Sequence, residues 1–184
     1  LVIKEIQKGK GTNAMAIETA GRLGTATSVD ALIAALSTDY KAEATAALLA
    51  FNGNINERVT TALKTATGDL QLALLDIANT RRIKSASPQV FELINSSDAT
   101  VAAAALKALP GVVTKENATQ LAGMMDKASG EKAAIYQQAF TASIKGMNAE
   151  EQYKVISSEI QKASNKARFY PALAATNTDQ SVAD

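Results

Sequence analysis

Apolar residues recur along this chain at the spacing of α-helices. Val29, Leu32, Ile33 and Leu36 stand at positions i, i+3, i+4 and i+7 without a mismatch, which places them on one face of a helix. Comparable stripes recur in residues 16–23, 44–51, 59–66, 118–125 and 135–144. The chain has only three prolines and ten glycines, too few for the many turns of a β sandwich. The pattern predicts an all-α protein.

Residues that favour helix ends separate these stripes. We expect Thr27 or Ser28 to cap the helix that carries Val29, and Asp69 to cap a following helix, because short polar side chains accept hydrogen bonds from the free N–H groups of a first turn. Asn148 with Glu151 three residues later predicts a variant of the capping box.

The clearest unit covers residues 87–111. A short amphipathic run leads to a polar turn at residues 95–98, and an alanine-rich run follows up to Pro110-Gly111. We interpret this as a helix, a tight turn and a second helix that ends at the Pro-Gly pair. Alanine favours helices and lets neighbouring helix backbones approach closely.

This helical hairpin is repeated. Residues 28–53 align with residues 86–111 at an offset of 58, and a further helix pair at about 56–79 fits between them. The period is therefore about 29 residues, with hairpins that begin near residues 28, 56, 87, 114 and 148. A fixed period of this length indicates a solenoid. We expect one domain over residues 1–184, a right-handed α-α superhelix of about five to six stacked hairpins.

The second helix of the unit carries a family resemblance. Its start at Asp98 with Val101, the small residues Ala104 and Ala105, and the final Gly111 resemble the second half of a short HEAT repeat of the kind common in bacterial arrays. The resemblance implies an armadillo-type solenoid in which Asp caps the helix and Val packs against the first helix. Family members often carry Arg directly after that Val, where this chain has Ala102, so we expect a weak or absent ladder of polar contacts between repeats.

Composition narrows the chemistry. The sequence has no His and no Cys, which excludes the commonest general base, thiol nucleophiles and the usual zinc sites. Its formal net charge is +1, without the basic excess that nucleic-acid-binding proteins usually show. No apolar run approaches the roughly 20 residues of a membrane span. We expect no cofactor, no metal and no nucleic acid. The compartment stays open, with an extracytoplasmic one slightly favoured.

Three short motifs have ordinary explanations. Ser129 and Lys132 match the S-x-x-K spacing of some acylating enzymes, but the companion S-D-N and K-T-G elements are missing. Residues 9–12 read Gly-Lys-Gly-Thr, yet Lys4 stands where a phosphate-binding loop needs its first glycine. Glu150 and Glu151 fall in a first helical turn, where the helix dipole favours carboxylates. None of the three predicts catalysis.

Arg81, Arg82 and Lys84 form the one tight basic cluster of the sequence. We consider them a candidate docking point for an acidic partner, with a solvated linker as the alternative. Asp76 lies in the most apolar predicted helix. A buried carboxylate needs a partner, and these basic residues could supply one. The alternative is that Asp76 faces solvent in a groove.

A helical solenoid performs no chemistry through its fold alone. Our first hypothesis is therefore a non-enzymatic interaction or scaffold module, part of a longer chain, that holds a protein or peptide on a concave face. Four predicted helices contribute to that face, near residues 41–51, 69–79, 99–109 and 131–145. The resemblance also allows an accessory region of a larger, secreted carbohydrate-active enzyme. Direct activity, as in solenoid-like lyases, has no support in the residues.

Overall fold

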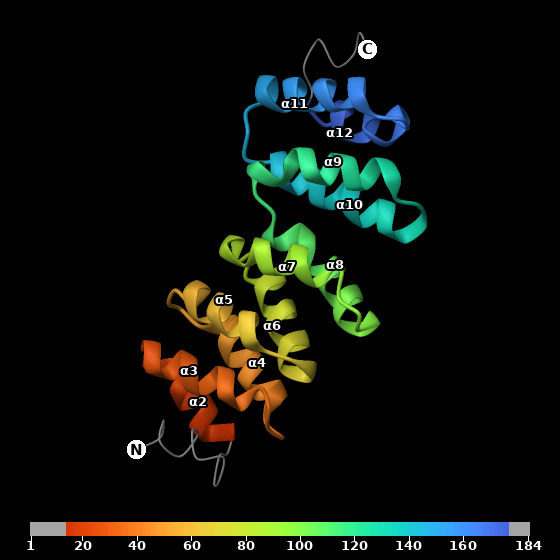
Figure 1. The fold of residues 1–184 in the computed structure, drawn as a ribbon. Helices are drawn as coiled ribbons and strands as arrows, with labels where there is room; N and C mark the ends of the chain where they lie inside the picture. Colours follow the sequence, from red (N-terminus) through yellow and green to blue (C-terminus); the bar gives the residue numbers. More distant parts are fainter. Residues whose placement is uncertain (1–13, 177–184) are drawn as a thin grey trace. The chain divides into compact units, whose positions relative to one another are not determined.

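The computed structural model describes residues 14–176, which form helices joined by turns and loops, with no β-strand among them. The α-helices are α2 (Ala14–Leu23), α3 (Ala26–Ala35), α4 (Lys41–Ala50), α5 (Asn56–Thr65), α6 (Gly68–Thr80), α7 (Ser87–Leu93), α8 (Ala99–Val112), α9 (Ala118–Lys127), α10 (Gly130–Ile144), α11 (Ala149–Lys162) and α12 (Tyr170–Ala174) (Figure 1). Three 3-10 turns accompany them, η1 (Lys84–Ala86), η2 (Lys115–Asn117) and η3 (Lys166–Arg168). The prediction of an all-α protein is confirmed.

The first helices of successive hairpins begin at regular intervals. α3, α5, α7, α9 and α11 start at residues 26, 56, 87, 118 and 149, so each start follows the previous one by 30 or 31 residues. These positions agree with the hairpins expected from the sequence, and the interval is slightly longer than the expected 29. The phosphate-loop-like residues 9–12 and the tail 177–184 lie outside the described residues.

Two compact units make up the chain, Leu1–Ala108 and Leu109–Asp184. Within the first unit the helices form two layers. The first layer contains α3, α5 and α7, in which each helix contacts the next, and the second layer contains α2, α4 and α6, again in sequence. Contacts between α3 and α4 and between α5 and α6 join the layers. Each helix from α2 to α6 therefore packs on the equivalent helix of a neighbouring hairpin within its own layer and on a helix of the other layer. The core lies between the two layers.

The second unit has the same local arrangement. α9 packs on α10 within one hairpin and on α11 of the next, and α11 packs on α12. The aromatic rings of Phe140 and Phe169 meet edge to face with centroids 5.6 Å apart, and both side chains are buried. The expectation of a single domain over residues 1–184 stays a prediction.

Most helix ends follow the sequence. Asp98 Oδ1 accepts hydrogen bonds from the backbone N–H groups of Thr100 and Val101 at the start of α8, at 2.8 and 3.2 Å. Asn148 and Glu151 form both hydrogen bonds of a capping box. This contact gives the Glu151 carboxylate a structural role, as its place in the first turn predicts.

Three helix boundaries differ from the prediction. The cap of α3 is Thr25, whose side chain accepts from the backbone N–H of Ser28 at 3.1 Å, so Ser28 lies inside the helix and is buried. α6 begins at Gly68 after Thr67, and Asp69 falls within its first turn. α8 passes through Pro110 to Val112, although proline has no N–H to donate to the preceding turn and its ring crowds the carbonyl of that turn.

Candidate functional site

The first arginine of the basic cluster is engaged in the fold. Arg81 follows α6, and its guanidinium donates to three backbone carbonyl groups at the end of α4. Nη1 lies 3.0 Å from the oxygen of Leu49 and 2.9 Å from that of Phe51, and Nη2 lies 3.1 Å from that of Gly53. The last carbonyl groups of a helix have no partner within it, and a cation there also interacts favourably with the helix dipole. Arg81 therefore joins neighbouring hairpins.

Arg82 and Lys84 are exposed. Arg82 has a φ of 54°, and its backbone N–H donates to Asn79 O at 3.1 Å while that of Ile83 donates to Ala78 O at 2.9 Å. This is the Schellman motif, which usually has glycine at the left-handed position. Partial burial, and then the charge of Arg82, lower the pKa of Lys84. Docking of an acidic partner stays a prediction for Arg82 and Lys84.

Asp76 faces solvent on α6. It lines a groove of about 190 Å³ with Leu72 and Asn79 of α6 and Lys107 of α8. The partners of Arg81 are carbonyl groups, so the predicted pairing of Asp76 with this arginine is wrong. The alternative interpretation, a carboxylate exposed in a groove, is confirmed.

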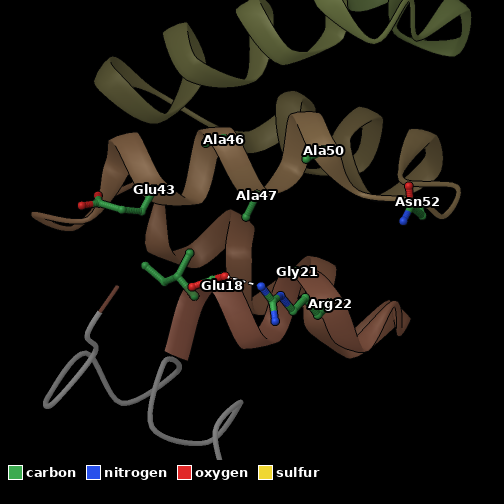
Figure 2. A pocket seen from close by; sticks show the side chains of 9 residues that line it. Glu18, Gly21, Arg22, Glu43, Ala46, Ala47, Ala50 and Asn52 are labelled. Carbon is green, nitrogen blue, oxygen red and sulfur yellow. Dashed lines mark hydrogen bonds and ion pairs between the residues drawn. The ribbon is translucent and has the colours of Figure 1, made fainter. Parts of the chain in front are cut away.

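A larger groove lies between α2 and α4, with a volume of about 440 Å³. This falls in the range of small ligand sites, about 300–1,000 Å³. Figure 2 shows the residues that line it, with Glu43, Ala46, Ala47 and Ala50 along α4, Glu18, Gly21 and Arg22 along α2, and Asn52 beyond the end of α4. We call it the α2/α4 groove. Both helices belong to the second layer of the first unit.

Small residues form the floor of the α2/α4 groove. A Cβ atom on Gly21 would lie 3.3 Å from the Cβ of Ala47, so the missing side chain lets the two helices approach closely here. Ala46 and Ala50 stand one helical turn apart and are exposed. The floor is therefore apolar and open to solvent.

Charged residues stand at the edges of the groove. The Glu18 carboxylate pairs with Arg22 one turn along α2, at 2.6 Å. Glu43 lies in the first turn of α4 and is exposed, and no hydrogen bond or ion pair involves it in the described structure. Within the described part of the chain, Glu43 is therefore an unpaired negative charge at this end of the groove, while the opposite end has the neutral amide of Asn52.

A third groove, of about 410 Å³, lies on the first layer between α3 and α5. An ion pair between Asp30 of α3 and Arg58 of α5 crosses it. The lining also includes the exposed first-turn carboxylate of Glu57. Most of the lining is charged or polar, so this groove lacks the apolar floor of the α2/α4 groove.

No group of three or more His, Cys, Asp or Glu side chains that could hold a metal ion occurs among residues 14–176. Ser129 is the residue before α10, and both Ser129 and Lys132 are exposed. No helix in the part of the chain that the structure describes is long and apolar enough to cross a membrane.

No protein-family model matches the sequence, and no curated protein matches it. The site must therefore be interpreted from its own geometry. Sequence reasoning missed the α2/α4 groove, because Ala47 was assigned to the apolar stripe of residues 44–51 and Ala46 and Ala50 were given no role. The available signal was weak: Ala46 and Ala50 stand at i and i+4 outside the apolar stripe of their helix, with Glu43 three residues before Ala46.

Proposed function

We propose that this chain is a non-enzymatic protein-interaction module that binds a peptide segment of its partner on the second-layer helices. The observation that carries the proposal is the α2/α4 groove, an open apolar surface of about 440 Å³ in a chain without His or Cys. Apolar grooves between helices are a common way to bind peptides. The groove between α6 and α8 extends the same kind of surface to the next hairpins.

The proposal includes the finer architecture. The 30- to 31-residue interval between hairpins and the contacts between alternate helices support a HEAT-like right-handed superhelix. In such a solenoid the second helices of the hairpins line the concave face. Within the first unit, the exposed residues of α4, α6 and the part of α8 up to Ala108 would then contribute to one binding surface. The accessory role beside an enzyme domain has no observation in its favour.

The experiment is a selection of linear peptides against the full chain, followed by mapping of the bound peptide by NMR. We expect binders, with chemical-shift changes concentrated on exposed residues of α2, α4, α6 and α8. Changes confined to the first-layer helices α3, α5 and α7 would contradict the proposed face. Failure to obtain any binder would contradict the proposed function.

A further inference from the structure

The α2/α4 groove has the length of a short helical segment. Its floor follows α4 from Glu43 to Ala50, a span of eight residues whose Cα atoms extend over about 10 Å at a rise of 1.5 Å per residue. Asn52 continues it beyond the helix end. A ligand that uses this length presents about two helical turns to the floor.

The walls of the groove favour a helix over an extended peptide. An extended peptide gains much of its affinity by pairing its backbone with an open sheet edge. α2 and α4 are helices, so their backbone groups are already bonded along each helix, and the described residues contain no strand. A partner helix satisfies its own backbone, and it needs only an apolar surface.

The floor matches a row of aliphatic side chains. Ala46 and Ala50 are at positions i and i+4 and are exposed, and Ala47 between them is half-buried. Small residues at this spacing let the ridge of a second helix pack closely, since ridges along i±4 rows fit into such grooves. Aliphatic residues at i and i+4 of the partner would fill the space above the alanines.

The edge charges specify the polar part of the partner. Arg22 is compensated by Glu18, whereas Glu43 has no partner among residues 14–176. A Lys or Arg on the partner, one turn from the aliphatic pair, would face Glu43. An acidic residue there would meet a like charge.

We propose that the α2/α4 groove binds an amphipathic helix with aliphatic side chains at i and i+4 and a Lys or Arg that faces Glu43. This inference rests on the proposed function, because it names the chemistry of the partner for the same surface. It also distinguishes this groove from the exposed Arg82 and Lys84, which would select an acidic partner.

The test uses a yeast-displayed library of peptides of about 15 residues, the length near which isolated helices become marginally stable. Selection against the full chain should enrich peptides with an aliphatic pair at i and i+4 and a basic residue one turn away. Replacing both Ala46 and Ala50 with Gln should weaken the enriched peptides at least about tenfold, because two longer side chains fill the floor. Gln has a helix propensity close to that of Ala, so α4 should stay folded.

Matched variants separate the groove from general effects. Ala34→Gln on α3 and Ala134→Gln on α10 change exposed helical alanines outside the groove and should leave the affinity unchanged. Glu43→Gln should weaken binding about two- to fivefold, as expected for an exposed ion pair. Glu131→Gln, another exposed first-turn carboxylate, should have no effect.

Other results would overturn the inference in distinguishable ways. Some peptides could bind the Ala46→Gln/Ala50→Gln variant as tightly as the wild type but bind Asp76→Lys more weakly. Their binding site would then lie between α6 and α8, which rejects this groove and keeps the proposed function. Selection of acidic peptides whose affinity falls in the Arg82→Glu variant would contradict the proposed basic residue on the partner helix. Binding that appears only when Leu1, Val2 and Ile3 are changed to Ser would assign the groove to the chain's own N-terminal segment. No binders at all would reject both proposals.

Discussion

Each unit contains an arginine that bonds to the C-terminal end of a helix in the preceding hairpin. In the first unit Arg81 donates to the carbonyl oxygens of Leu49, Phe51 and Gly53, which are 28 to 32 residues earlier. In the second unit Arg168 donates to the carbonyl oxygens of two α9 residues that are 42 and 43 positions earlier. Both arginines satisfy acceptors that the helix itself leaves free.

The two contacts differ in their use of acids. Arg81 bonds only to carbonyl groups, whereas Asp126, one of the two α9 residues, adds its carboxylate to the second contact. This carboxylate accepts from the backbone N–H groups of Asn165 at 2.8 Å and Ser164 at 3.0 Å, just after α11. Both contacts connect neighbouring hairpins. The acceptors in the first unit are backbone carbonyl groups, whereas the second unit adds the carboxylate of Asp126, which can be protonated.

The largest effect should come from removing the first contact. Arg81→Met keeps an apolar stem but leaves three carbonyl groups without their charged donor. Hydrogen bonds to charged groups contribute about 1.5–3 kcal/mol each when buried, and Arg81 is only half-buried. We expect the free energy of unfolding, measured with urea, to fall by about 2–3 kcal/mol.

Two variants sharpen that result. Arg81→Lys keeps the charge but loses the planar fork of donors, so it should recover less than half of the loss. Arg82→Met changes an exposed neighbour that makes no side-chain hydrogen bond in the described structure, and it should stay within about 0.5 kcal/mol of the wild type. Equal losses for Arg81→Met and Arg82→Met would show that the carbonyl contacts do not stabilise the unit.

The second contact should respond to pH. The backbone N–H of Asn165, followed by that of Ser164, lowers the pKa of Asp126. A lowered folded-state pKa means that the carboxylate stabilises the fold above its unfolded pKa of about 3.9, and that this stability is lost as the pH falls through the folded value. We expect Asp126→Asn to be less stable than the wild type by a constant amount from pH 7 to about pH 5.

Below about pH 4 the difference in free energy of unfolding between Asp126→Asn and the wild type should shrink. The protonated carboxyl group is no longer a stronger hydrogen-bond acceptor than the asparagine amide. The measurement is the free energy of unfolding of both proteins at each pH. Glu116, whose pKa is lowered mainly by the Thr114 hydroxyl, is present in both and cancels. A difference that stays constant down to pH 2 would show that Asp126 does not act through its charge.

Local signals made much of the fold predictable. Asp98 before an alanine-rich run, and Asn148 three residues before Glu151, each specify a helix start within a few residues of sequence, and both caps are present. The cap of α3 was assigned to the wrong residue because Thr25, Thr27 and Ser28 are chemically similar. Only the buried position of Ser28 inside the helix distinguishes them.

Contacts over one repeat could not be predicted in the same way. Arg81 bonds to backbone carbonyl groups, which every residue has, so no complementary side chain marks the target in the sequence. For this reason Arg81 appeared equivalent to Arg82, although one is engaged in the fold and the other is exposed. The α2/α4 groove depends in the same way on Gly21 meeting Ala47, two residues whose proximity no local pattern encodes.

The smallest expected effect concerns the turn that follows α6 and positions Arg81. Among the described residues other than glycine, only Arg82 has a positive φ, at 54°, so the first contact depends on a left-handed residue and the second does not. The left-handed conformation costs an L-residue about 1–2 kcal/mol, and glycine avoids this cost but loses more backbone entropy on folding. Arg82→Gly should therefore raise the free energy of unfolding by about 0.5–1 kcal/mol. Gly68→Ala is the opposite change, because it places a side chain on a glycine with the same φ of 54°. An added Cβ there meets no atom within 4 Å, so only the backbone conformation should matter. We expect it to lower the free energy of unfolding by about 1 kcal/mol. If Arg82→Gly instead destabilises the protein while Gly68→Ala behaves as expected, the Arg82 side chain itself stabilises the turn, and the two contacts are less alike than their hydrogen bonds indicate.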